Sequence, residues 1–248
     1  MGLCDYKEEV VVKLLERSRH LKNIIKAAIA IAGIMLASQS FAGTINNVYI
    51  DQVGSGSTIT LNQQGSNNEI GNDTTATTLH GNGQTVSISQ VGSGNTHVVN
   101  VQGANSVINS TVTGDNNNTT VACGAAPSSS CNDTAITANV SGNTNNTSIT
   151  AGSKSTVTAE ITGSTNNTTV SSTTTNLMGA VVGVKETGDS NVVNINQNGP
   201  AGASGFISKV EVTGASNNVA VTQSGTTDST VNIKSTGSNN SIAVTSSN

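Results

Sequence analysis

From residue 43 onward, apolar and polar residues alternate in short stretches, and Gly and Asn recur between the stretches. A period of two predicts β-strands with one buried face. Gly and Asn favour tight corners between strands because they tolerate positive φ. Eight glycines serve as anchors that align these stretches into repeated units: Gly54, Gly92, Gly114, Gly142, Gly163, Gly188, Gly214 and Gly237.

Residues at fixed offsets from the anchors agree across the units. The third residue after the anchor is Asn in every unit except the first, which has Ser57: Asn95, Asn117, Asn145, Asn166, Asn191, Asn217 and Asn240. The seventh residue after it is always apolar: Leu61, Val99, Val121, Ile149, Val170, Ile195, Val221 and Val244. The sixth residue before it is apolar except for Ser208: Val48, Val86, Ile108, Ile136, Val157, Val182 and Val231. Each unit therefore predicts a strand, a Gly-x-x-Asn corner and a second strand.

Successive anchors are 38, 22, 28, 21, 25, 26 and 23 residues apart. We interpret the longest spacing as a unit with an insertion near residues 72–82, and the spacing of 28 as a unit with a loop at 123–131. A single unit cannot bury its apolar face, but stacked units share one continuous core. The predicted fold is all-β: a β-solenoid of about eight strand-turn-strand rungs of about 21–26 residues, with amyloid-like stacking.

Gln recurs near the strand ends. Gln52 and Gln90 lie two residues before an anchor, whereas Gln63, Gln197 and Gln223 lie nine residues after one. Stacked Gln and Asn side chains can hydrogen-bond along a cross-β stack. We therefore expect ladder or turn roles for these Gln residues and for the Asn of each corner, rather than ligand binding.

The N-terminal segment has a different character. Residues 27–37 (AAIAIAGIMLA) form an apolar run that follows several basic residues, and small residues stand at −3 and −1 of a cut before Gly43. This pattern is typical of a secretory signal, and the run is short for a membrane span. An uncleaved anchor is the alternative. The sequence thus divides into a signal segment, 1–42, and a repeat domain, 43–248.

Cys123 and Cys131 are the only cysteines after the signal segment. Outside the cell, two nearby cysteines are expected to form a disulfide, here one that closes a loop outside the stack. A metal site is not expected, because only His80 and His97 could complete a ligand set. His97 stands at an inward position, so a packed histidine is expected there.

Composition excludes several classes of function. Residues 43–248 carry four Lys, no Arg and ten acidic residues, a formal net charge of −6, and their only aromatic residues are Tyr49 and Phe206. A nucleic-acid partner is not expected, since little basic charge is present to neutralise phosphates. The acidic residues are scattered, and no base and orienter accompany the many Ser and Thr, so neither an enzyme nor a cofactor is expected.

Several stretches resemble the curlin repeat, a Gln-x-Gly-x-x-Asn core with a second Gln nine residues after the Gly. The first unit (VYIDQVG, 48–54, then ITLNQQG, 59–65) resembles the repeat, and VSISQVGSGN (86–95) resembles its first half. VNINQ (193–197) and VAVTQ (219–223) are similar to the second half. The resemblance covers nearly all of 46–246. It implies a secreted β-solenoid subunit of bacterial extracellular functional amyloid, exported through an outer-membrane pore.

The other units depart from this pattern, because the first Gln is replaced at Val112, Val140, Ile161, Glu186, Val212 and Ser235. The chain therefore resembles a divergent or minor curlin. The expected function is a structural subunit that self-assembles into, nucleates or anchors curli-like fibres for surface adhesion and biofilm matrix. Its expected partners are further copies, related fibre subunits and the export pore, and its expected location is the cell surface. The alternative is a monomeric β-solenoid adhesin or ice-binding protein, for which Thr119, Thr147 and Thr168 share one offset, although that offset points inward.

Overall fold

The computed structural model describes residues 34–36, 46–72, 74–124, 131–173, 179–199 and 205–247. The expected cut before Gly43, most of the signal segment and the loop 125–130 lie outside these residues. Every regular element in the described part is a β-strand, and all strands belong to the unit formed by Ile31–Asn248. The all-β prediction is therefore confirmed, and no helix interrupts the described repeats.

The strands form two sheets, which we name sheet A and sheet B. Sheet A contains β1 (Ile34–Leu36), β4 (Thr58–Ser66), β7 (Thr85–Ser93), β9 (Val107–Thr113), β11 (Ala135–Ser141), β13 (Thr156–Thr162), β15 (Val181–Thr187), β17 (Phe206–Thr213) and β19 (Ser229–Thr236), in that order. Sheet B contains β2 (Asn47–Val48), β5 (Glu69–Ile70), β8 (Thr96–Gln102), β10 (Asn118–Cys123), β12 (Asn146–Ala151), β14 (Asn167–Ser172), β16 (Val192–Asn198), β18 (Asn218–Ser224) and β20 (Ser241–Ser247). Two further strands of sheet B, β3 (Ile50–Val53) and β6 (Thr77–His80), pair with each other, and β6 also pairs with β8.

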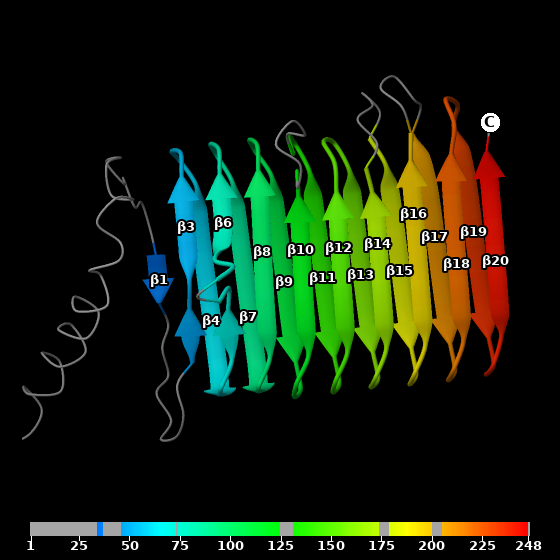
Figure 1. Cartoon of the computed structure of the whole chain (residues 1–248), viewed down its shortest axis with the longest axis horizontal. Helices are drawn as coiled ribbons and strands as arrows, with labels where there is room; N and C mark the ends of the chain where they lie inside the picture. The colour runs from blue at the N-terminus through cyan, green and yellow to red at the C-terminus, as the bar shows by residue number, and fades with distance from the viewer. Residues whose placement is uncertain are drawn as a thin grey trace, which may run out of the picture. The chain divides into compact units, whose positions relative to one another are not determined.

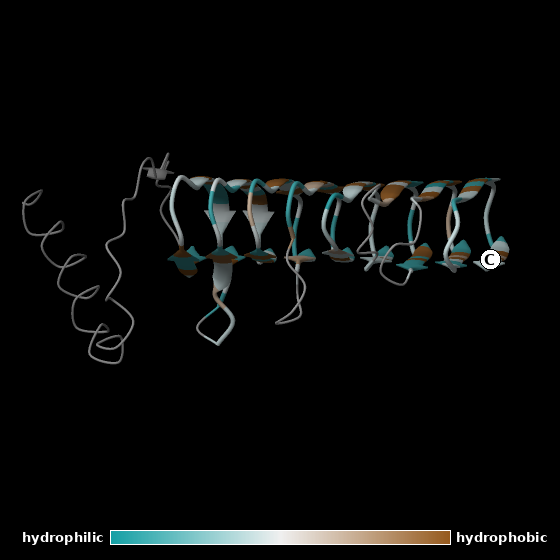
Figure 2. Ribbon diagram, turned by 90° about the horizontal axis from the view of Figure 1, so that it is seen from above, coloured by the Kyte–Doolittle hydropathy of each residue, from teal (hydrophilic) through white to brown (hydrophobic). Residues whose placement is uncertain are grey.

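The chain alternates between the sheets, and every strand pair is parallel, as in β10 with β12 and β13 with β15. One strand of each sheet makes a rung, and rungs follow one another along the stack (Figure 1). Seen from above, the two sheets lie as two facing rows (Figure 2). This arrangement is the predicted β-solenoid.

The Gly-x-x-Asn corners connect sheet A to sheet B within each rung. Gly163 has a φ of 123°, and a Cβ placed on it would lie 2.1 Å from the carbonyl oxygen of Gly188 in the next rung. The residue two places after the anchor is also left-handed, as in Thr144 with a φ of 60° and Asn239 with a φ of 61°. Close stacking of corner on corner therefore requires glycine at the anchor.

Gly54 was wrongly chosen as the anchor of the first repeat unit. Gly54 stacks on Gly81, and Gly81 on Gly103, at the opposite corner of the solenoid. The glycine that stacks on Gly92 is Gly65, and the Asn three residues after it is Asn68. The error arose because both corners use a positive-φ glycine between alternating stretches, so a shift of half a rung leaves the local pattern intact.

This shift corrects three further assignments. Leu61 pairs with Ile88 in sheet A instead of joining the column of Val99. Val48 is 40% exposed and is not a core residue. The insertion predicted near 72–82 is shorter, because 77–80 form strand β6 of sheet B.

The core is one side-chain layer deep between the sheets. Seven of the eight predicted members of one apolar column are consecutive register partners: Val99, Val121, Ile149, Val170, Ile195, Val221 and Val244. The facing column of sheet A runs through Ile59, Val86, Ile108, Ile136, Val157, Val182, Ser208 and Val231. Small residues such as Ala138 and Ala159 fill the space between, which explains how the stack packs with few aromatic residues.

Candidate functional site

The Asn side chains of the corners form a continuous hydrogen-bonded ladder. In Asn117, Nδ2 donates to Oδ1 of Asn95 over 3.0 Å and to the carbonyl oxygen of Gly142 over 2.7 Å. The backbone N–H of Asn117 donates to the same Oδ1 over 3.0 Å. Asn145 repeats this arrangement with Asn117 and Gly163. Each buried amide is thus engaged with the rungs before and after it, which makes the ladder a stacking device.

The ladder extends beyond the members found in the sequence. Oδ1 of Asn46 accepts the backbone N–H of Asn68 over 3.0 Å, and Oδ1 of Asn217 accepts that of Asn240 over 3.0 Å. Asn46 and Asn68 were missed, although each stands three residues after a glycine, Gly43 and Gly65. The ladder therefore runs from Asn46 at one end of the described stack to Asn240 at the other.

The Gln residues form two separate pairs. Nε2 of Gln63 donates to Oε1 of Gln90 over 2.9 Å in sheet A, and Nε2 of Gln197 donates to Oε1 of Gln223 over 2.9 Å in sheet B. Gln52 is in register with Leu79 and does not stack on Gln90. The grouping of Gln52 with Gln90, and of Gln63 with Gln197 and Gln223, was therefore wrong. Both errors follow from the first anchor, which was placed half a rung away from the corner occupied by the others.

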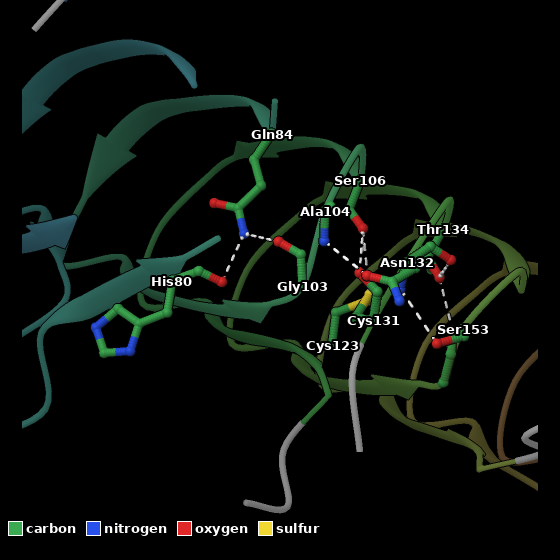
Figure 3. Close-up of a disulfide and its surroundings, with 11 residues drawn as sticks. His80, Gln84, Gly103, Ala104, Ser106, Cys123, Cys131, Asn132, Thr134 and Ser153 are labelled. Carbon is green, nitrogen blue, oxygen red and sulfur yellow. Dashed lines mark hydrogen bonds between the residues drawn. A yellow bond between two sulfur atoms is a disulfide. The ribbon is translucent and has the colours of Figure 1, made fainter. Parts of the chain in front are cut away.

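The sulfur atoms of Cys123 and Cys131 are bonded, and both residues are fully buried in the hydrophobic core (Figure 3). Cys123 ends β10 in register with Val101 and Ala151. The backbone N–H of Cys131 donates to the carbonyl oxygen of Gln102, and Oγ of Ser106 donates to the carbonyl oxygen of Cys131 over 2.8 Å. The expectation of a disulfide outside the stack was wrong, because Cys123 occupies an inward position of β10 and both cysteines are buried.

Two ionisable side chains lie in the core. His97 of β8 is fully buried, and burial lowers its pKa to about 4. Glu186 of β15 is fully buried, and burial raises its pKa to about 7 against the opposing effect of a 2.6 Å hydrogen bond from Oγ1 of Thr168. His97 is packed as its inward position predicted. The burial of Glu186 was missed, although the offset that it occupies is apolar in most other units, as in Ile161 and Val212.

The other charged residues of the strands lie on the outer faces of the two sheets. Glu160, Lys185, Glu211 and Lys234 follow one another in register on sheet A, with 3.6 Å between Nζ of Lys234 and Oε2 of Glu211. His80 and Asp51 form a second exposed pair at 3.3 Å on sheet B. Within the described ranges no three His, Cys, Asp or Glu residues gather where they could hold a metal ion. The same residues include no helix long and apolar enough to cross a membrane.

The last rung leaves its core open. β19 and β20 end the two sheets, and no described strand pairs with their far edges. Ile242 and Val244 of β20 are half-buried, whereas their register partners Val219 and Val221 are completely buried. At the other end, Ile50 of β3 is half-buried against the core, whereas its register partner Thr77 is completely buried. In sheet B both ends of the described stack thus present unpaired strand edges beside partly exposed apolar side chains, whereas in sheet A the edge of β4 is paired with β1.

No family model, curated protein or solved structure matches this chain.

Proposed function

We propose that the protein is a structural subunit that stacks end to end with further copies of itself. The observation that carries the proposal is the open final rung, in which Ile242 and Val244 remain half-buried beside the free edges of β19 and β20. An unpaired strand edge is a template for another strand. With β1 removed together with the signal segment, the edge of β4 would be free, and a second copy in the same register would extend both sheets and bury these side chains.

The Asn ladder supports the same joint. The backbone N–H of Asn240 donates to Oδ1 of Asn217 in the preceding rung, and Oδ1 of Asn240 is the next acceptor in the ladder. Asn46 accepts from Asn68 in the manner of every later member. A copy placed beyond β20 would bring its Asn46 next to Asn240, so one amide ladder would continue through the joint.

The resemblance to curlin repeats supports a fibre outside the cell as the destination of this assembly. On this proposal the signal segment directs export, an outer-membrane pore releases the chain, and the fibre serves surface adhesion and biofilm matrix. Related fibre subunits are further proposed partners. The resemblance is strongest in the first two units and at 193–197 and 219–223, which favours a divergent member of such a system.

A monomeric surface protein, either an adhesin or an ice binder, is the second candidate. Its supporting observation is a regular polar row on the outer face of sheet B, where Nδ2 of Asn118 donates to Oδ1 of Asn146, and Nδ2 of Asn146 to Oδ1 of Asn167, over 3.3 Å each. The aligned residues Thr119, Thr147 and Thr168 cannot serve this role, because all three are buried between the sheets.

Seeded growth of purified protein distinguishes the two candidates. We expect thioflavin-positive fibres that add protein to fragmented seeds and give a cross-β reflection near 4.8 Å, the spacing of neighbouring strands. A chain that stays monomeric at high concentration in the presence of seeds contradicts the assembly proposal. Thermal hysteresis of that monomer would favour the second candidate.

A further inference from the structure

Two uncompensated ionisable groups sit in the core at different positions along the stack. His97 lies in β8, towards the N-terminal end, and Glu186 lies in β15, several rungs further on. Both side chains are completely buried. A charge placed at such a position is costly unless an opposite charge or several hydrogen bonds accompany it.

No opposite charge faces His97. Its register partners in sheet B are Ile70 and Thr119. Neither ring nitrogen has a hydrogen-bond partner. The packed strands β7, β9 and β10 carry no titratable residue other than the disulfide-bonded Cys123. His80 of β6 is in register with Gln102 of β8 and lies on the outer face, where it pairs with Asp51. Glu69 of β5 is in register with Thr96, one residue from His97, and therefore projects to the opposite face of the sheet.

Glu186 is equally isolated from cations. Its register partners are Ile161 and Val212, and β14 and β16 carry no charged residue. The charged residues of β13, β15 and β17 alternate to the outer face, where they are exposed or half-buried: Glu160, Lys185, Lys209 and Glu211. The single partner of the carboxyl group is the hydroxyl of Thr168, and Oε1 has none.

We propose that these two side chains make the stack a two-sided pH switch, in which acid opens the rungs around β8 and base opens the rungs around β15. The opening is local because each rung of a solenoid contacts only its neighbours. This inference concerns the folded chain itself and does not depend on end-to-end assembly.

The signs of the two effects oppose each other. The pKa of His97 falls from 6.5 to about 4, so its neutral form contributes stability above pH 6.5 that is lost as the pH falls towards 4. The pKa of Glu186 rises from 4.5 to about 7, so its neutral form contributes stability below pH 4.5 that is lost as the pH rises through 7. Between pH 4.5 and 6.5 both groups change the free energy of unfolding, and because their effects have opposite signs the two slopes with pH cancel. Removing either group should therefore expose the slope of the other, about tenfold in the unfolding equilibrium per pH unit.

Pulsed hydrogen exchange read by mass spectrometry tests the proposal in the full chain. The protein is held at pH 3.5, 5.5 or 8.5 and then labelled briefly at one fixed pH, so that differences report opening rather than exchange chemistry. We expect β7–β10 to label first after acid and β13–β17 first after base. Glu186→Gln should abolish the second pattern and keep the first, and His97→Thr, which repeats the residue of the next rung, should do the reverse.

The matched control is Glu211→Gln, which removes an acid from the outer face of the neighbouring strand β17 and should leave both patterns unchanged. If Glu186→Gln does not fold, Glu186→Val repeats the Val212 of the same column and serves instead. Labelling that is uniform along the stack at both extremes overturns the proposal. So does base-induced labelling of β13–β17 that persists without the carboxyl group.

Discussion

Single side-chain amides hold each corner to its two neighbours, and Asn145 shows how much one residue carries. It donates to Oδ1 of Asn117 and to the carbonyl oxygen of Gly163, and its own Oδ1 accepts the N–H of Asn166. Replacing it leaves buried polar partners unsatisfied, each at a cost of about 1–3 kcal/mol. Asn145→Leu should therefore lower the free energy of unfolding by at least ~2 kcal/mol, measured by urea denaturation. Asn146→Leu, at the exposed neighbouring position, should change it far less.

Two glycines of neighbouring rungs separate the effect of backbone conformation from that of side-chain size. Gly163 has a positive φ, and an added Cβ would overlap the carbonyl oxygen of Gly188. Gly183 of β15 has an open space where a Cβ would stand. We expect Gly163→Ala to destabilise the protein by roughly 1–3 kcal/mol or more through strain, and Gly183→Ala to stabilise it by about 0.5–1 kcal/mol. Equal melting temperatures for the two variants would contradict the close-stacked corner.

At this scale the sequence predicted most of the repeat. The offsets that define the corner and the apolar column of Val99 were correct for every unit after the first, because each rung repeats the same steric requirement. The first unit was misaligned, since Gly54 and Gly65 occupy opposite corners with the same local signature. The burial of Glu186 also escaped prediction, because an acidic side chain is seldom buried without a partner, although Ile161 and Val212 at the same offset mark the position as inward.

Among the elements, β10 and β11 are linked by the disulfide between Cys123, the last residue of β10, and Cys131, shortly before β11. Chain entropy predicts that a loop of this size is worth about 2–3 kcal/mol. Because the sulfur atoms lie in the core, we expect the double variant Cys123→Ser, Cys131→Ser to lose that amount and to exchange amide hydrogen faster in β10 and β11. Circular dichroism should still show β-structure, since rungs on either side retain their own partners. Loss of all β-structure, or unchanged exchange in β10 and β11, would contradict this role.

Strand type and order were predictable, whereas the breaks in the first rungs were not. Alternation identifies a strand, but it does not show that sheet B contains two short strands in each of the first two rungs, β2 and β3 in one and β5 and β6 in the next. The buried position of the disulfide likewise depends on Cys123 standing on the inner face of β10, in register with Val101 and Ala151. Such features are set by tertiary contacts between rungs rather than by the residues of one rung.

For the whole molecule, the direction of backbone hydrogen bonds identifies which groups of β20 would meet another copy. In sheet B the N–H groups of outward-facing residues donate to the following strand, as Asn218 does to the carbonyl oxygen of Asn240 over 2.8 Å. Ser241 is the register partner of Asn218, and Ala243 lies two residues further on the same face. The N–H of Ala243 therefore points to the open edge, whereas that of Ala220, its register partner in β18, points to β20.

Proline at these two positions separates assembly from folding. Proline removes a backbone donor and is tolerated on an edge strand when the lost N–H faces solvent. We expect Ala243→Pro to leave the circular dichroism and melting temperature of the monomer nearly unchanged. It should slow seeded growth at least tenfold, because the contact between two copies loses one backbone hydrogen bond and the proline ring lies in the way of the incoming strand. Ala220→Pro should weaken both folding and growth, since its N–H is bonded within the chain. If Ala243→Pro elongates seeds at the unmodified rate, the edge of β20 is not the docking surface. The monomeric surface protein would then be the better account of this stack.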